Sequence, residues 1–318
     1  MKRMTKDLQS EVFHHVLGSQ HFREVSHTRK GDQARVLDIG TGTGKWAIEY
    51  AEKYRDHVFV TGVDIRVIGS ELVPPNCDFV VDDCEKEWTW KDQFDYIRIS
   101  GTAGCIKDVQ ALVKQAFENL QPGGILQMVD FDLRLKCDDG NPSRDNPAFE
   151  FFERHAVAST ELERPIDVVL QYREMMQEAG FHLLINDVVK VPINEWPLIP
   201  RENELGSLMQ TFITKDPEGM FTDRLVSGLK VPPEQVMLDC VVVRKELGNK
   251  NNHFYFPLHH VVGQKPNLET KGGPCPAAEE AENGTQAPEE RPEMLANVAT
   301  ARKRKADGDV DTGHKRVC

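Results

Sequence analysis

The chain has 318 residues, of which 39% are hydrophobic and 28% charged, and its formal net charge is −12 at pH 7. This length allows one large globular domain or two small ones with a sizeable core. The acidic balance argues against a nucleic-acid partner, because a broad phosphate-binding surface needs clustered Lys and Arg. The sequence has no apolar run long enough to predict a membrane span, and its polar N-terminus has no secretory pattern. We therefore expect a cytoplasmic protein.

The cysteine and histidine spacing argues against a metal site. The seven cysteines form no Cys-x-x-Cys pair, and their odd number is typical of free thiols in a reducing compartment. The His14-His15 and His259-His260 pairs are adjacent, so their side chains do not share one helix face as ligands at i and i+4 would.

Short apolar runs alternate with helical patterns through the first half of the chain. Strands alternating with helices predict βαβ units and a doubly wound, mostly parallel α/β sheet. The helix before Gln121-Pro122-Gly123-Gly124 should end there, because Gly and Pro stop helices. The expected helices are 5–17, 45–54 and 109–120, and the expected strands are 34–39, 58–63, 78–81, 94–99 and 125–131.

The alternation continues and is then interrupted. We expect helices over 147–163 and 166–179 and a strand over 181–191. Residues 193–248, including a helix over 233–247, look like a helical insertion before a last strand at 254–262. Such an insertion could be a lid over a substrate cavity or a packing embellishment, and both interpretations stay open.

The C-terminal composition predicts a disordered tail. From about Gly263 the aromatic residues vanish, and Pro, Gly, Ala, Glu and Lys dominate. We therefore expect an N-terminal helix or cap over 1–30, the main domain over 31–264, and the tail over 265–318. The cluster Arg302-Lys303-Arg304-Lys305 is either a nuclear import signal or part of an ordinary mixed-charge tail.

The most specific motif is a glycine loop, Gly40-Thr41-Gly42-Thr43-Gly44, that follows a predicted strand and opens a helix. Doubly wound sheets bind ligands at this position. The dinucleotide pattern fails because Lys45 stands at its third glycine position, and the phosphate-loop pattern fails because Ile39 and Trp46 occupy defining positions. A third cofactor, S-adenosylmethionine, carries no phosphate and so does not need either pattern. Asp38, just before the loop, could accept a hydrogen bond from its ammonium group.

Acidic residues follow the next two predicted strands. Asp64 is about 20 residues past the loop, where a carboxylate can accept hydrogen bonds from ribose hydroxyls. Asp82 or Asp83 could accept from the adenine amino group, and two isoleucines could enclose the ring. The predicted cofactor-binding residues are Asp38, Gly40, Thr41, Gly42, Gly44, Asp64, Ile65, Asp82, Asp83, Cys84 and Ile99.

No general base is assigned from the sequence. Methyl transfer from a sulfonium to an acceptor needs mainly alignment of the two reactants. A general base helps when the acceptor is a hydroxyl or an amine. The aromatic residues Trp88, Trp90 and Phe94 are expected to pack rather than to form a substrate cage. The catalytic candidates are His14, His15, His155, Asp130 and Asp132.

These motifs resemble the seven-stranded class I S-adenosylmethionine-dependent methyltransferases and, within them, the fungal LaeA-like group. The resemblance covers roughly residues 10–266 and implies the strand order 3-2-1-4-5-7-6 with an antiparallel seventh strand. It rests on the loop Val36–Gly44 with Trp46-Ala47-Ile48, Gly62-Val63-Asp64, Val73-Pro74-Pro75-Asn76-Cys77, Asp82-Asp83 with Glu87-Trp88, Leu120–Gly124, Cys137-Asp138-Asp139-Gly140, Glu178-Ala179-Gly180-Phe181 and Gly263-Gln264-Lys265-Pro266.

The resemblance implies two functions. One is an enzyme that methylates a small-molecule acceptor in fungal secondary metabolism, and the other is a nuclear regulator that acts through protein partners. A nucleic-acid methyltransferase is disfavoured, because Ile99-Ser100-Gly101-Thr102 lacks the Asp/Asn-Pro-Pro-aromatic motif. Gly104-Cys105-Ile106-Lys107-Asp108 replaces the usual Gly-Ser-Ile-x-Asp, and Val109 replaces an aromatic residue.

Overall fold

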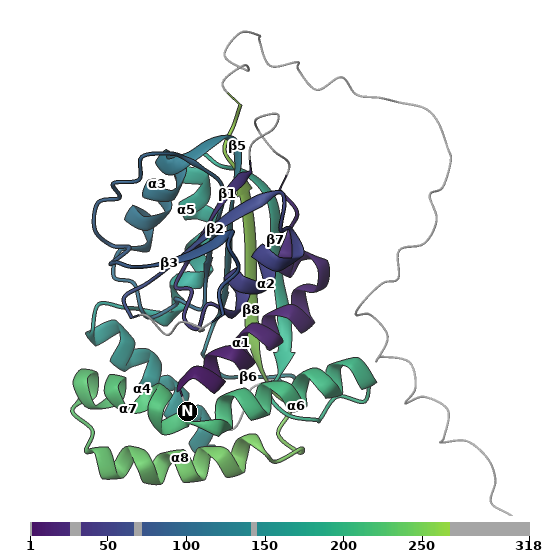
Figure 1. Cartoon of the computed structure of the whole chain (residues 1–318). Coiled ribbons are helices and arrows are strands. Elements are labelled where there is room, and N and C mark those ends of the chain that lie inside the picture. Colours follow the sequence, from purple (N-terminus) through teal and green to yellow (C-terminus); the bar gives the residue numbers. More distant parts are fainter. Residues whose placement is uncertain (1, 26–32, 67–71, 141–144, 268–318) are drawn as a thin grey trace, which may run out of the picture. The chain divides into compact units, whose positions relative to one another are not determined.

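The computed structural model describes residues 2–25, 33–66, 72–140 and 145–267 (Figure 1). The predicted tail from residue 268 onward, including Arg302–Lys305, lies outside these ranges. The described part of the chain belongs to a unit that spans Met1–Lys271.

An eight-stranded sheet forms the centre, with the order β3-β2-β1-β4-β5-β8-β6, and β7 pairs with β8. Strands β1 to β5 are parallel, and β8 is antiparallel to β5 and β7. The strands are β1 (Ala34–Ile39), β2 (Val58–Asp64), β3 (Cys77–Val81), β4 (Phe94–Ser100), β5 (Leu120–Phe131), β6 (Lys136–Cys137), β7 (His182–Pro192) and β8 (Phe254–Gln264). With β7 and β8 as sixth and seventh strands, the implied order is confirmed, and the two-residue β6 is an addition.

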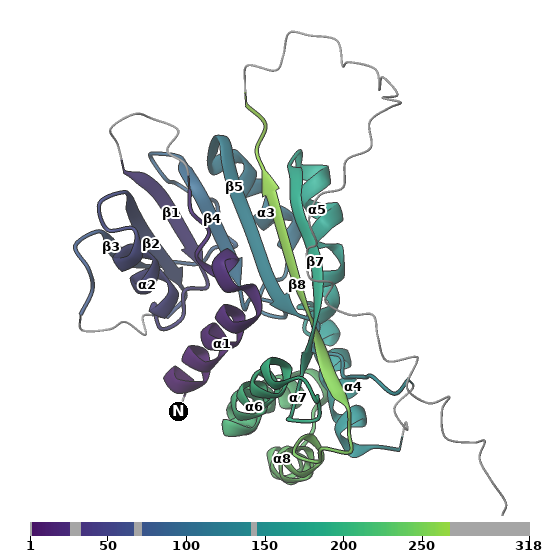
Figure 2. The same ribbon diagram turned by 90° about the vertical axis from the view of Figure 1, so that its right-hand side faces the viewer.

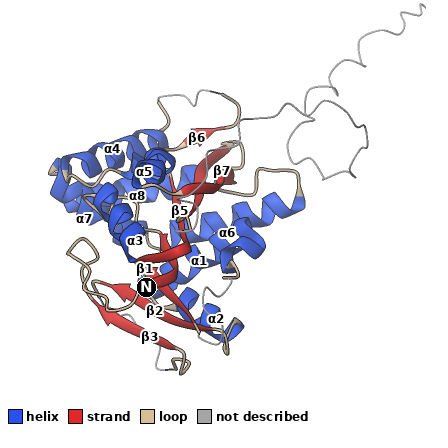
Figure 3. Cartoon of the chain, turned by 90° about the horizontal axis from the view of Figure 1, so that it is seen from above, coloured by secondary structure: helices blue, strands red, loops and turns tan. Residues whose placement is uncertain are grey.

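Helices cover both faces of the sheet (Figures 2 and 3). Alternation along β1 explains this arrangement, because successive side chains point to opposite faces. Val36 packs with Trp46 on one face, while Leu37 packs with Leu112 on the other. The first face carries α1 (Lys2–Leu17), the 3₁₀ segment η1 (Gly18–Phe22) and α2 (Lys45–Lys53), and the second carries α3 (Val109–Asn119), the 3₁₀ segment η2 (Ile166–Gln171) and α5 (Tyr172–Ala179).

A layer of four helices lies beyond the carboxyl ends of the parallel strands, below the sheet in Figure 1. It consists of α4 (Pro147–Glu161), α6 (Pro200–Lys215), α7 (Pro217–Leu229) and α8 (Pro233–Leu247). Each of them has a proline in its first turn, where the missing N–H costs nothing. The predicted helical insertion between β7 and β8 is therefore confirmed as α6 to α8. We call these four helices the cap.

The cap builds an apolar cluster of its own. Met209, Phe221 and Val243 of the insertion pack with Phe152 of α4 and Phe256 of β8, and all five are buried. The cluster also contains Phe13 of α1, so it continues to the N-terminal helix. The predicted disorder of residues 265–267 is not what the structure shows, because Lys265 Nζ donates to the Phe117 and Leu120 carbonyls at 2.6 and 2.7 Å.

Two local predictions are wrong. Residues 166–179 do not form one helix, because 166–171 is the 3₁₀ segment η2 and α5 begins at Tyr172. A 3₁₀ turn aligns residues i and i+3, which buries Ile166 and Val169 together. Strand β5 begins at Leu120 rather than Ile125, with a register shift against β4 where the predicted turn lies.

Candidate cofactor site

A hollow of about 50 Å³ lies at the carboxyl ends of β1 and β4, between the glycine loop and α1. Four of the predicted residues line it, together with side chains from α1 and β4 that the sequence patterns did not single out. The lining residues are Gln9, Ser10, Phe13, Asp38, Gly40, Thr41, Gly42, Thr43, Lys45, Trp46, Arg98, Ser100 and Gly101.

The glycine loop follows β1 and is anchored to the neighbouring strand. The backbone N–H groups of Gly40 and Thr41 both donate to the Val63 carbonyl, at 2.9 and 3.0 Å. Gly40 has φ +75°, and a Cβ there would lie 2.7 Å from Thr102 Cγ2. The loop therefore depends on a missing side chain at this position, as expected for a backbone that a ligand approaches closely.

Gly44 gives a direct test of how tightly the loop is held. It has φ +77°, and a Cβ there would overlap the Phe79 ring, which includes Cε1 at 2.7 Å. We expect Gly44→Ala to lower the free energy of unfolding by about 1–3 kcal/mol in chemical denaturation. Gly18→Ala is the control, because Gly18 has φ +54° with nothing within 4 Å. Equal losses in the two variants would mean that Phe79 does not constrain the loop.

Asp38 forms a buried ion pair beneath the loop. Its Oδ1 lies 2.9 Å from Arg98 Nη1, and the two side chains are 1% and 5% exposed. The strand register sets this pair, because Asp38 of β1 lies opposite Arg98 of β4. The guanidinium carbon also lies 4.5 Å from the centre of the Trp46 ring. Arg98 is therefore a site residue that the sequence analysis missed.

The second oxygen of Asp38 is available for a ligand. Burial raises the pKa of Asp38, while the nearby Arg98 guanidinium acts against that rise. Asp38 Oδ2 is buried, and no group among the described residues has hydrogen-bond geometry to it. A buried acceptor of this kind is costly unless something donates to it. Since Asp38 lines the hollow, an ammonium group there fits the donor that is missing.

Asp64 ends β2 and supports the loop from the other side. Its Oδ2 accepts from the Gly42 N–H at 2.9 Å, and its Oδ1 accepts from the Arg66 N–H at 3.2 Å. The Asp82 N–H donates to the Asp64 carbonyl at 3.2 Å, which joins the ends of β2 and β3. The structure thus brings Asp64 to the glycine loop. A carboxylate can accept several hydrogen bonds, and a role of Asp64 toward the ribose stays a prediction.

The remaining predicted cofactor residues differ in accessibility. Ile65 is 65% exposed, whereas Ile99 is fully buried in the apolar cluster on the face of the sheet that α3 and α5 cover. Burial raises the pKa of the Cys84 thiol to about 12, which makes it a poor nucleophile. Asp82 is exposed and Asp83 half-buried beside it, at the carboxyl end of β3. Their roles toward the cofactor stay predictions.

Helix α1 holds the outer wall of the hollow through two polar contacts. The Thr43 hydroxyl donates to Asp7 Oδ1 at 2.7 Å, and Lys45 Nζ lies 2.7 Å from Glu11 Oε1. Phe13 on the same helix is buried in the cap cluster. The N-terminal helix is therefore part of the site wall.

The three histidine candidates have different environments. His14 is exposed and stacks on His21 with 5.2 Å between ring centres, while His15 is half-buried on the same helix. His155 is 1% exposed, and its Nε2 lies 3.1 Å from Arg224 Nη1. Burial, together with Arg224, lowers the pKa of His155 to about 3, so this ring is neutral. None of these contacts assigns a catalytic base.

The two aspartate candidates are buried in hydrogen-bond networks. Asp130 accepts from the Ala103 N–H at 3.1 Å and from the Tyr172 hydroxyl at 3.0 Å. Asp132 accepts two hydrogen bonds from the Arg134 side chain, both at 2.8 Å. Asp130 thus holds the loop after β4, and Asp132 holds the loop after β5. No group of three or more potential metal ligands occurs among the residues that the structure describes.

Asp130 should give a pH-dependent stability. Burial raises its pKa to about 6. A raised carboxyl pKa means that the folded state holds the proton more tightly, so this group lowers stability as pH rises from about 3.9 to about 6. As pH rises from 4 to 7, the free energy of unfolding of Asp130→Asn should increase by about 2–3 kcal/mol relative to that of wild type. Urea denaturation across this range checks it, and a constant difference would contradict the raised pKa.

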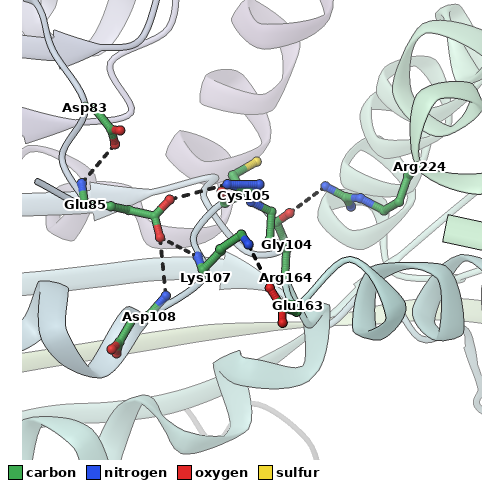
Figure 4. A network of polar contacts seen from close by, with 9 residues as sticks. All are labelled: Asp83, Glu85, Gly104, Cys105, Lys107, Asp108, Glu163, Arg164 and Arg224. Atoms are coloured by element: carbon green, nitrogen blue, oxygen red, sulfur yellow. Dashed lines mark hydrogen bonds and ion pairs between the residues drawn. The ribbon is translucent and has the colours of Figure 1, made fainter. Parts of the chain in front are cut away.

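The loop that departs from the usual motif is held by hydrogen bonds and an ion pair (Figure 4). Glu85 Oε1 accepts from the Lys107 N–H at 2.7 Å, and Lys107 Nζ lies 2.7 Å from Glu163 Oε2. Arg164 Nε donates to the Cys105 carbonyl, and Arg224 Nη2 donates to the Gly104 carbonyl at 2.8 Å. The loop is therefore attached to the end of β3 and to cap helix α7. Val109 is buried at the start of α3, where it packs in the core.

The packed aromatic residues and the cysteines agree with the sequence analysis. Trp88, Trp90 and Phe94 pack in the apolar cluster with α3, so the packing interpretation is confirmed. The described cysteines, Cys77, Cys84, Cys105, Cys137 and Cys240, are free thiols. Within the described ranges, no helix has the length and apolar character to cross a membrane.

Comparisons with known proteins give consistent results. The methyltransferase-domain family model matches residues 13–185. The chain is 32% identical to "Methyltransferase pytC" of Aspergillus terreus, over 73% of this chain and 71% of that protein. It is 31% identical to "Secondary metabolism regulator LAE1" of Cochliobolus heterostrophus, over 74% and 77%. It is 30% identical to "Protein-methionine methyltransferase laeA" of Emericella nidulans, over 73% and 62%.

Proposed function

Because the chain belongs to the S-adenosylmethionine-dependent methyltransferase family, we propose that it methylates a small molecule of fungal secondary metabolism. The similarity to a methyltransferase and to regulators of secondary metabolism in fungi supports this setting. The acidic net charge supports a small-molecule acceptor over a nucleic acid.

The main evidence for a cofactor site is the buried Asp38 oxygen that has no hydrogen-bond partner among the described residues. In our proposal, Asp38 and the glycine loop hold the amino-acid end of the cofactor. Asp64 holds the ribose, and Asp82 or Asp83 takes the adenine end. Arg98 holds Asp38 in place, because its guanidinium lies 2.9 Å away, and it opposes the rise in pKa that burial causes. The cofactor supplies a methyl group on a positively charged sulfur.

The chemistry demands alignment from this chain. A lone pair on the acceptor forms the new bond to the methyl carbon while the carbon–sulfur bond breaks, and that electron pair stays on sulfur. Holding the two reactants in line supplies much of the rate. Asp64 holds the loop after β1, and Asp130 and Glu85 hold the loop after β4, which limits the motion of these loops around the reacting groups. A proton released by the acceptor goes to water or to a base that we leave unassigned.

The experiment uses the full chain, cofactor labelled in its methyl group, and a fungal cell extract. After acid precipitation, we expect the label in a soluble product that chromatography separates from the unreacted cofactor. Label confined to precipitated protein would contradict a small-molecule acceptor and favour the second candidate. No transfer to either fraction, together with no cofactor binding in calorimetry, would contradict the proposed activity itself.

The second candidate is a nuclear regulator that acts through protein partners. The similarity to two proteins whose names include secondary metabolism or LaeA supports it. It requires nuclear import, for which Arg302–Lys305 is the candidate signal. Replacement of these four residues by alanine in a fluorescent fusion should then move the protein from the nucleus to the cytoplasm. An unchanged distribution would remove this role for the cluster.

A further inference from the structure

Helix α8 is apolar on two opposite faces. Its inner face is buried in the cap cluster through Val236, Cys240, Val243 and Leu247. Its outer face carries four more apolar side chains, which are Met237, Leu238, Val241 and Val242, exposed by 54%, 62%, 62% and 41%. A helix of a monomeric protein normally has a polar outer face. A contiguous exposed apolar stripe is typical of an interaction surface.

Charged residues close the two ends of this outer face. Glu234 and Lys245 are exposed, and their spacing of 11 residues places them on the same side of the helix as the apolar stripe. Neither has an ion-pair partner within the described ranges. The flanks of α8 differ, since Asp239 pairs with Arg154 at 2.9 Å and Arg244 pairs with Glu218. The outer face is thus apolar in the middle, negative at one end and positive at the other.

The residues along this face are arranged symmetrically about the middle of the helix. Apolar residues mirror apolar residues, and the acidic residue at one end mirrors the basic residue at the other. About a midpoint between Asp239 and Cys240, Leu238 mirrors Val241 and Met237 mirrors Val242. Glu234 mirrors Lys245 about the same point. When two copies of a helix pack antiparallel about a two-fold axis, mirrored residues face each other. The antiparallel arrangement also brings helix ends of opposite partial charge together.

We propose that the outer face of α8, made of Glu234, Met237, Leu238, Val241, Val242 and Lys245, binds a second copy of this chain in an antiparallel two-fold dimer. Val241 meets Leu238 of the second copy near the axis, and each Glu234 meets a Lys245. The pattern fits a self-complementary surface, because every group on it finds its complement on an identical copy. One helix pair buries less than the roughly 800 Å² per partner of a standard interface. The dimer is therefore weak and depends on protein concentration.

The first test is sedimentation of the full chain over a series of protein concentrations. We expect a reversible monomer–dimer equilibrium that Val241→Glu weakens by about tenfold or more, because it places charge near the axis without a partner. Val157→Glu is the matched control, since Val157 is 51% exposed on cap helix α4. Thermal unfolding of both variants should match wild type, which separates association from folding.

Charge reversal tests the antiparallel register. Glu234→Lys alone should weaken the dimer by about three- to tenfold, because two lysines then face each other at both ends. Lys245→Glu alone should act similarly. The double variant Glu234→Lys/Lys245→Glu should restore wild-type association. Parallel packing would not give this recovery.

Three results would overturn the proposal. One is a monomer at every concentration, as expected if another part of this chain or a different protein covers α8. Another is a dimer that Val241→Glu leaves unchanged, which would place the interface elsewhere. The third is a double charge variant no stronger than the single variants, which would exclude the antiparallel register.

Discussion

Replacing Arg98 with methionine is expected to lower the free energy of unfolding by about 3–5 kcal/mol, because it leaves the Asp38 carboxylate buried without its partner. Urea denaturation at pH 7 measures this loss. The double variant Asp38→Asn/Arg98→Met should recover much of it, since no unpaired charge stays buried. If the single variant were no less stable than the double variant, the buried pair would not have the role described.

The same variant should respond to pH in a defined direction. Burial already raises the pKa of Asp38, and removing Arg98 takes away the main opposing influence. The carboxyl group is then protonated at a higher pH in the folded state than in the unfolded chain, so the loss should shrink as pH falls. Arg35→Met is the control, because Arg35 pairs with Asp92 at 3.1 Å on the surface, with side chains 41% and 58% exposed. We expect it to cost at most about 1 kcal/mol.

Asp64→Ala should weaken binding of S-adenosylmethionine by about ten- to a hundredfold. Hydrogen bonds to a charged group contribute about 1.5–3 kcal/mol, and 1.4 kcal/mol corresponds to a factor of ten. The variant also loses the acceptor for the Gly42 N–H, so the loop is less well held. Titration calorimetry measures the affinity of wild type and variant.

Two further variants make this measurement specific to the carboxylate. Asp78→Ala removes an exposed acid from the adjacent strand β3, and it should bind as wild type does. Asp64→Asn retains one acceptor oxygen and should fall between wild type and Asp64→Ala. Equal affinity of Asp64→Ala and wild type would remove the proposed role of Asp64, whatever the thermal stability of the variant.

Features that depend on adjacent residues could be predicted from the sequence. The apolar run before Gly40, the glycines of the loop and the acid at the end of β2 are local signals. They were enough to predict the sheet and to place Asp64 at the end of its second strand. The order of the strands came from the family resemblance, and the structure agrees with it.

Features that depend on strand register or on distant helices could not be predicted in the same way. Arg98 lies 60 residues from Asp38, and only the pairing of β1 with β4 brings them together. Arg224 reaches the Gly104 carbonyl from a helix 120 residues later. A basic residue inside the buried strand Phe94–Ser100 was the one available signal for Arg98. For Arg224 the sequence holds no comparable signal.

The continuity of the cap cluster has a consequence for how this chain could be re-engineered. Strand β8 extends beyond the end of β5, from Leu258 opposite Phe131 back to Phe254. The side chains around this extension join all four cap helices to Phe13 of α1, which also lines the hollow. A chimaera that took residues 193–253 from a relative would therefore create a mismatch under α1. A working chimaera would have to take the cap helices and the N-terminal helix α1 from the same relative.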